Sequence, residues 1–237
     1  MHIEHVALWV SGLDRMGLTL TIEVDAAHSV SALLLLPERA SACLVLAHGA
    51  GAGMRHPSMA SLAEGLAERG VATLRYQFPY MEQGGRRPDP PPLCHATVRA
   101  AVAEARRLLP DLALFAGGRS FGGRMTSQAQ AIEPLADVKG LVFCAFPLHA
   151  AGKPDAARAA HLAKVRIPML FLQGTRDALA DLRLLEPLIA ELGSRATLKI
   201  LDGADHSFHV LARSGGSDEA VRREMLDTAA GWLTAAR

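Results

Sequence analysis

The chain has 237 residues, half of them apolar, and no low-complexity tract, so a single domain over residues 1–237 can bury a substantial core. Its 25 basic and 24 acidic residues give a formal net charge of +1, which offers no reason to expect nucleic acid as a partner. The longest apolar runs, such as residues 30–36, fall far short of the roughly 18 residues of a membrane span, and the N-terminus lacks a signal peptide's basic region, so we expect no membrane association.

Short runs rich in leucine, valine and isoleucine recur between amphipathic segments. From residue 42 onward this alternation predicts βαβ units, and therefore an α/β fold with a mainly parallel central sheet and helices on both faces. The first three runs follow one another closely, which favours an antiparallel N-terminal edge. The expected strands are 3–10, 18–24, 30–36, 42–47, 71–75, 112–116, 138–145, 167–172 and 196–201.

Apolar residues at helical spacing predict helices that pack on this sheet. The proline-rich stretch 84–92 interrupts the pattern and is expected to form a surface loop. Only about 20 residues separate the strand ending near Cys144 from the one beginning near Ile167, which leaves little room for a cap. The expected helical faces lie within residues 59–67, 98–108 and 221–233.

The most informative motif is Gly118-Arg119-Ser120-Phe121-Gly122. It follows an apolar run that predicts a strand and precedes a segment that reads as a helix. This is the setting of a G-x-S-x-G nucleophile elbow, in which a tight turn presents a strained serine and leaves room only for glycine on either side. The motif therefore predicts Ser120 as a nucleophile.

A serine hydroxyl needs a base to accept its proton and an acid to orient that base. Asp177 and His206 each follow a predicted strand, at the sheet edge where ligands bind in open parallel sheets. The chain order serine, aspartate, histidine is that of the α/β-hydrolase fold. Asp181 is an alternative acid that could instead begin the next helix, and His209 is an alternative base.

Acyl transfer also requires donors for the oxygen that becomes negative in the tetrahedral intermediate. The backbone N–H of Phe121 is one candidate, because it opens the helix after Ser120. The second should come from the glycine-rich loop 48–53, where Ala50 is preferred over Gly51. His48, at the start of this loop, is expected to hold the loop by hydrogen bonds rather than to react.

With these motifs the chain resembles the α/β-hydrolase superfamily, and within it the small dienelactone-hydrolase-like proteins. It looks most like the group that includes testis-expressed and histone-acetyltransferase-complex relatives. The resemblance covers roughly residues 30–235 and implies nucleophile Ser120, acid Asp177 and base His206. The chain differs from true dienelactone hydrolases, whose nucleophile is cysteine, so their substrate is not carried over. The sequence motifs on which this resemblance rests are His-Gly-Ala-Gly-Ala-Gly, Gly-Gly-Arg-Ser-Phe-Gly-Gly, Phe-Leu-Gln-Gly-Thr-Arg-Asp and Gly-Ala-Asp-His-Ser-Phe.

Together these features predict a serine hydrolase that cleaves a small ester, or a thioester or amide, through an acyl-serine intermediate. The alternative is a hydrolase-fold binding or scaffold subunit, a role that some members of the resembling group have. Little room for a cap predicts a shallow site for a small-molecule acyl substrate. The residues expected to contact that substrate are Arg119, Phe78, Tyr80 and Phe208, and Phe121 is expected to form a further apolar wall. Arg119 could instead brace a loop by hydrogen bonding.

The remaining expectations concern cofactors, metals and environment. No cofactor is implied, and histidines and acidic residues are too scattered to predict a metal site. The three cysteines are an odd number, and two of them lie in apolar runs, which suits a reduced state and a cytoplasmic location. A homo-oligomer is compatible with this sequence. The cysteines are Cys43, Cys94 and Cys144.

Overall fold

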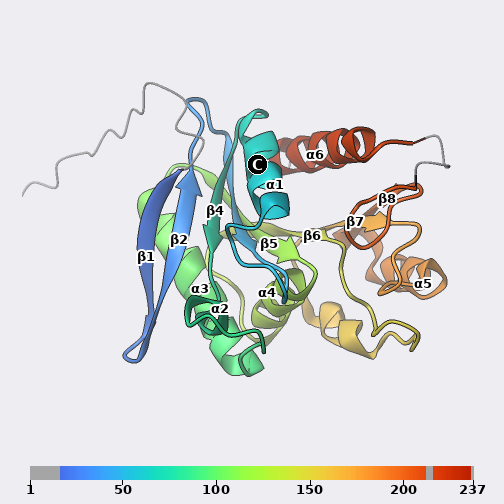
Figure 1. Cartoon of the computed structure of the whole chain (residues 1–237), viewed down its shortest axis with the longest axis horizontal. Helices are drawn as coiled ribbons and strands as arrows, with labels where there is room; N and C mark the ends of the chain where they lie inside the picture. Colours follow the sequence, from blue (N-terminus) through green and yellow to red (C-terminus); the bar gives the residue numbers. More distant parts are fainter. Residues whose placement is uncertain (1–16, 212–215, 236–237) are drawn as a thin grey trace, which may run out of the picture.

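An eight-stranded sheet runs through the computed structural model, which describes residues 17–211 and 216–235 (Figure 1). The strand order is β1-β2-β4-β3-β5-β6-β7-β8. Neighbours from β4 to β8 are parallel, whereas β1 and β2 extend the sheet in antiparallel fashion at one edge. The strands are β1 (Leu18–Asp25), β2 (His28–Leu35), β3 (Ala42–Ala47), β4 (Val71–Tyr76), β5 (Ala113–Arg119), β6 (Val138–Cys144), β7 (Met169–Gly174) and β8 (Ala196–Leu201).

The predicted α/β class, with a mainly parallel sheet and an antiparallel N-terminal edge, is confirmed. Each expected strand from residue 18 onward has a counterpart, although β7 begins and ends two residues later than expected. The expected strand 3–10 lies outside the described residues. Hydrophobic runs identified the strands well because parallel strands are buried on both faces and read as continuous apolar segments.

Helices cover both faces of the sheet, so the sheet divides two apolar cores (Figure 1). Helices α1 and α6 pack on one face, and α3 and α4 with the 3-10 helix η1 pack on the other. Successive strand residues point to opposite faces, so β3 contributes Leu44 to one core and Val45 to the other. The helices are α1 (Pro57–Ala67), α2 (Pro79–Glu82), α3 (Pro91–Leu108), α4 (Phe121–Ile132), α5 (Leu182–Leu192) and α6 (Asp218–Ala235), with 3-10 helices η1 (Ala157–Lys164) and η2 (Gly193–Arg195).

The proline-rich stretch differs in part from the expectation of a surface loop. Pro91 and Pro92 form the first turn of α3, which therefore begins seven residues before the predicted apolar face at residue 98. Proline is tolerated there because the N–H groups of a first helical turn have no partner within the helix. The short helix α2, which begins at Pro79, was not anticipated from the sequence.

The connection between β6 and β7 contains only the short 3-10 helix η1, in keeping with the expected absence of a large cap. All three cysteines are buried and unpaired. Among the helices of residues 17–211 and 216–235, none is both long and apolar enough to cross a membrane.

Candidate active site

Ser120 forms the turn between the last residue of β5, Arg119, and the first residue of α4, Phe121. Its backbone has φ 50° and ψ −115°, a region that side-chain-bearing residues rarely adopt and that costs about 1–3 kcal/mol. The turn is held because the N–H of Ser120 donates to the carbonyl of Cys144 at 2.9 Å. The strained turn therefore presents the serine side chain at the C-terminal end of the parallel sheet.

The glycines on either side of this turn are required by close approach of strand β3. A Cβ atom at Gly118 would lie 2.6 Å from the carbonyl oxygen of Ala47, and one at Gly122 would lie 2.5 Å from that of His48. Both neighbours are backbone atoms, so neither can move aside as a flexible side chain could. The glycine pattern read in the sequence thus has a steric cause in the structure.

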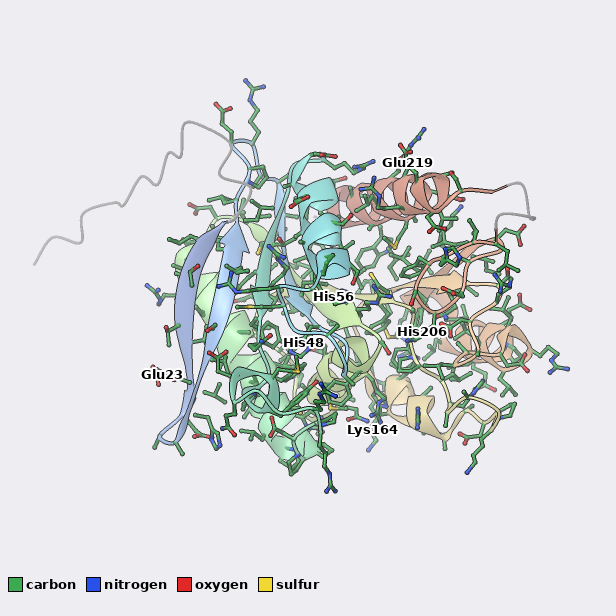
Figure 2. The ribbon with its side chains drawn as sticks, in the orientation of Figure 1. Glu23, His48, His56, Lys164, His206 and Glu219 are labelled. Carbon is green, nitrogen blue, oxygen red and sulfur yellow. The ribbon has the colours of Figure 1, made fainter. Side chains whose placement is uncertain are left out.

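The structure brings Ser120, His206 and Asp177 into one chain of hydrogen bonds. Nε2 of His206 lies 2.9 Å from Oγ of Ser120, and Nδ1 of His206 lies 2.8 Å from Oδ2 of Asp177. Because a carboxylate only accepts, Nδ1 carries the proton and Nε2 is free to accept from the serine hydroxyl. Figure 2 places His206 in the middle of the molecule, well away from the edge strand β1 that carries Glu23.

The carboxylate of Asp177 is enclosed, with its side chain 0% exposed against 27% for His206. Its Oδ1 accepts the N–H of Leu179 at 2.8 Å, and its Oδ2 also accepts from Nε2 of Gln173 at 2.5 Å. Sequence analysis missed Gln173. The available signal was one amide side chain at the end of the otherwise apolar run of β7, since a buried polar group in a central strand needs a partner.

The two alternative residues are engaged elsewhere. Asp181 caps the N-terminus of α5 by accepting the N–H of Arg183 at 2.9 Å, and its hydrogen bonds with the side chain and backbone of Arg183 lower its pKa to about 2. His209 pairs through Nδ1 with Asp218 at 2.8 Å, and that hydrogen bond raises the pKa of His209 above its usual value. Neither side chain belongs to the hydrogen-bonded chain at Ser120.

His48 holds the glycine-rich loop in place, as expected from the sequence. Its Nε2 accepts the N–H of Phe78 at 3.0 Å, so its Nδ1 carries the proton and donates to the carbonyl of Gly49 at 2.8 Å. Burial lowers the pKa of His48 to about 4, which keeps the ring neutral in this role. Because a trans peptide points its C=O and N–H in opposite directions, fixing the Gly49 carbonyl also fixes the N–H of Ala50.

Three of the residues expected to contact substrate are held among other side chains. Phe78 is fully buried and packs against the ring of Phe121 at 5.5 Å. Tyr80 donates its hydroxyl to the carbonyl of Ala50 at 2.8 Å. Phe208 is 9% exposed and lies below the guanidinium of Arg119 at 5.9 Å.

Arg119 itself donates to the backbone carbonyl of His206 at 3.4 Å, so it braces the loop that carries this histidine. Arg119, Phe78, Tyr80 and Phe208 are all absent from the lining of the pocket beside Ser120. Phe121, which was also expected as an apolar wall, does line the pocket, and Phe78 packs behind it. The sequence identified an aromatic neighbourhood, but it could not rank the rings by depth.

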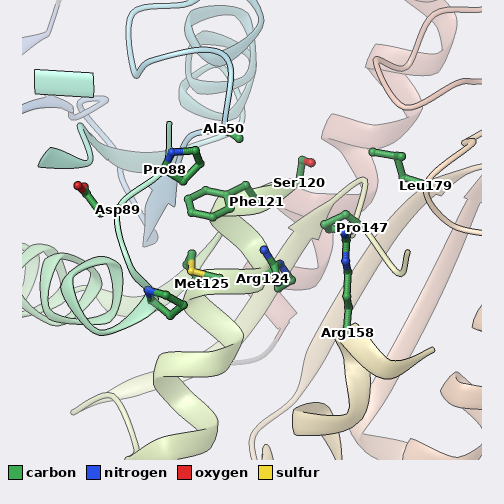
Figure 3. A pocket seen from close by; sticks show the side chains of 11 residues that line it. Ala50, Pro88, Asp89, Ser120, Phe121, Arg124, Met125, Pro147, Arg158 and Leu179 are labelled. Carbon is green, nitrogen blue, oxygen red and sulfur yellow. The ribbon is translucent and has the colours of Figure 1, made fainter. Parts of the chain in front are cut away.

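A pocket of about 410 Å³ opens beside Ser120, as Figure 3 shows. The two proposed oxyanion residues Ala50 and Phe121 line it together with Ser120, whereas Gly51 does not. Within residues 17–211 and 216–235, no group of three or more histidine, cysteine or acidic side chains gathers as a metal site. The other lining residues are Pro88, Asp89, Pro91, Arg124, Met125, Pro147, Arg158 and Leu179.

Comparison with known proteins gives matches over most of the chain. A family model described as an alpha/beta hydrolase domain matches residues 40–234. A dienelactone hydrolase from Anabaena variabilis superposes with a TM-score of 0.70 at 21% identity, covering 92% of this chain and 96% of that one.

Two further solved structures have the same fold. A lidless α/β serine hydrolase from Xanthomonas campestris gives a TM-score of 0.71 at 21% identity, with 92% and 95% of the two chains covered. An esterase domain from Rhodothermus marinus gives 0.69 at 16% identity, with 92% and 98% covered. At these identities the structural likeness establishes the fold alone.

Proposed function

The chain belongs to the alpha/beta hydrolase family, and on that premise we propose that it is a serine hydrolase that cleaves a small ester through an acyl-serine intermediate. The observation that carries this proposal is the hydrogen-bonded chain from Ser120 through His206 to Asp177. The order of donors along it leaves Nε2 of His206 as the acceptor for the serine proton, which is the arrangement that activates a hydroxyl nucleophile.

In the proposed first step, Oγ of Ser120 attacks the ester carbonyl while its proton passes to Nε2 of His206. The carbonyl oxygen becomes negative and is received by the N–H groups of Phe121 and Ala50. His206 then gives the proton to the leaving alcohol, and the bond between the acyl carbon and that alcohol breaks. Asp177 keeps the imidazole in the required tautomer and stabilises its positive form.

In the second step a water molecule attacks the acyl carbon and passes its proton to His206. The bond to Ser120 breaks, the proton returns to Oγ, and a carboxylic acid is released. Every proton taken up by His206 is given back within the same step, so no cofactor is needed for this balance.

Three features support a small substrate and the choice of Ala50 as oxyanion donor. The pocket of about 410 Å³ is near the lower end of the roughly 300–1,000 Å³ found for ligand sites. The β6–β7 connection adds only a short 3-10 helix above the sheet. Hydrogen bonds from His48 and from the N–H of Ala52 to the carbonyl of Gly49 hold the peptide that carries the N–H of Ala50.

A fluorophosphonate probe tests the proposal directly, because it labels serines that are activated as nucleophiles. We expect labelling of the native chain, none of Ser120→Ala, and hydrolysis of p-nitrophenyl acetate that parallels the labelling. We also expect p-nitrophenyl palmitate to be a poorer substrate than the acetate. Absence of labelling in well-folded protein would contradict the proposal and favour a binding or scaffold subunit.

A further inference from the structure

Two arginines line the pocket beside Ser120 and come from different elements. Arg124 is on the first turn of α4, four residues after Ser120, and Arg158 is on η1. Figure 3 shows the side chain of Arg158 extending from its helix toward Pro147, and Arg124 between it and Met125. Two cations on the wall of one small cavity repel each other, so this arrangement is electrostatically unfavourable unless an anion lies between or near them.

Neither arginine is neutralised by a neighbouring acid. Within the part of the chain that the structure describes, no carboxylate lies within ion-pairing distance of Arg124 or Arg158, whereas Arg69 and Arg107 each pair with an acid at 2.7 Å or closer. Nε of Arg124 is buried and has no hydrogen-bond partner among the described residues. Both guanidinium groups can therefore form an ion pair with a bound ligand.

The surroundings of Arg124 also make an unpaired cation unfavourable. Its guanidinium lies 5.8 Å from the ring of Phe121, a contact that compensates only part of its lost hydration. Burial, followed by repulsion from Arg158, lowers the pKa of Arg124 below its usual value. A bound anion would relieve both effects at once.

One acid, Asp89, does line the same pocket, and it reduces the positive charge without cancelling it. Its Oδ2 accepts the N–H of Tyr80 at 2.8 Å, which keeps this carboxylate on the α2 side of the cavity. The pocket thus carries two positive side chains and one negative side chain. Its walls also include the apolar side chains of Met125, Pro147 and Leu179, which suit a short hydrocarbon segment.

We propose that Arg124 and Arg158 form a subsite for a carboxylate group carried by the ester substrate. This inference rests on the proposed serine-hydrolase function and adds a substrate class to it. A carboxylate is favoured because a guanidinium presents paired N–H donors that match its two oxygens. The carboxylate can belong to the acyl part or to the alcohol part of the ester, and the two arms of the experiment separate these cases.

The experiment compares charged and neutral partners of matched shape. On the acyl side, p-nitrophenyl hydrogen glutarate is compared with p-nitrophenyl pentanoate; on the alcohol side, para-acetoxybenzoate is compared with para-tolyl acetate. We expect kcat/KM, normalised to each ester's second-order rate constant for hydrolysis by hydroxide, to favour the charged partner by about tenfold or more in one arm. Arg124→Gln and Arg158→Gln should each remove most of that preference, measured as the ratio of kcat/KM for the charged ester to kcat/KM for its neutral partner in the same variant.

Arg87→Gln is the matched control, because Arg87 is exposed near the same pocket edge as Pro88 but does not line the cavity. It should retain the preference. A loss as large in Arg87→Gln as in the pocket variants would overturn the subsite and indicate a general surface field. Equal rates for charged and neutral esters in both arms would also overturn it.

Fluorophosphonate labelling separates failure of this inference from failure of the proposed function. Labelling of Ser120 without any preference for charged esters refutes the arginine subsite alone. A folded chain that neither reacts with the probe nor hydrolyses any of the four esters refutes both proposals.

Discussion

Replacing Asp177 by asparagine tests the proposed role of this residue with almost no change in volume. The carboxylate receives three donors in the structure: the N–H of Leu179 on Oδ1, and both Nε2 of Gln173 and Nδ1 of His206 on Oδ2. An asparagine offers only one acceptor oxygen. The NH₂ group of the asparagine, itself a donor, must therefore face groups that are donors in the native structure.

The structure indicates which way the amide will turn. With its oxygen toward the N–H of Leu179, the new NH₂ group faces Gln173 and His206. Gln173 can adapt by turning its own amide, because its Oε1 is buried and without a partner among the described residues. His206 can adapt only by moving its proton to Nε2, which then donates toward Ser120 and cannot accept the serine proton.

We therefore expect Asp177→Asn to lower kcat by roughly ten-thousand-fold, as found where a triad histidine is held in the wrong tautomer. That factor corresponds to about 5 kcal/mol of transition-state stabilisation. The assay is hydrolysis of p-nitrophenyl acetate by protein shown to be folded by circular dichroism. Retention of more than about a tenth of the native kcat would refute this reasoning.

Asp181→Asn is the matched control, because it removes an equivalent charge four residues away from Asp177. Asparagine also caps helices well, so α5 should keep its N-terminal cap, and the exposed pairing with Arg183 contributes little. We expect kcat within about twofold of the native value. A larger loss in Asp181→Asn than in Asp177→Asn would reverse the assignment of the acid.

Two further predictions concern stability. Gly122→Ala should lower the free energy of unfolding, measured in urea, by about 1–3 kcal/mol, because the new methyl group would lie 2.5 Å from a backbone oxygen. Gly231→Ala is the control: it lies in open space on α6 and should raise the free energy of unfolding by up to about 1 kcal/mol. Similar effects in the two variants would contradict the steric argument. Burial lowers the pKa of His48 from 6.5 to about 4, so between these pH values the unfolded chain binds a proton at His48 and the folded chain does not. The free energy of unfolding should therefore fall as the pH drops from about 6.5 toward 4. If His48→Asn shows the same pH dependence, the loss of stability belongs to other groups.

The fold and the turn at Ser120 could be predicted because their causes are local. Residues 112–116 form a continuous apolar run, which is the pattern of a strand buried on both faces. Gly118 and Gly122 report a backbone approach that excludes every larger residue at two fixed positions. Constraints of this kind leave a residue-by-residue trace, so a single sequence is enough to find them.

The two arginines of the pocket wall and the depth of the nearby aromatic rings left no such trace. Arg124 and Arg158 are 34 positions apart in the chain and meet only because η1 packs against α4. Phe78 and Tyr80 were expected at the surface of the site, but the backbone turns into α2 at Pro79 and directs both rings inward. Depth and facing depend on how elements pack, which hydrophobic periodicity does not encode.

Backbone strain gives a physical link between the sheet and the proposed chemistry. Three of the four non-glycine residues with positive φ in the described chain are Ser120, Ala145 and Phe208. Ser120 directly follows β5, Ala145 directly follows β6, and Phe208 lies in the loop that carries His206. Each such conformation costs about 1–3 kcal/mol and persists only where its surroundings enforce it. Here β6 accepts the N–H of Ser120 and β7 accepts the N–H of Ala145 through backbone carbonyls, so neighbouring parallel strands fix the turns that orient the site. The buried sheet thus supplies the rigidity that holds Ser120 and His206 in hydrogen-bonding distance before any substrate arrives.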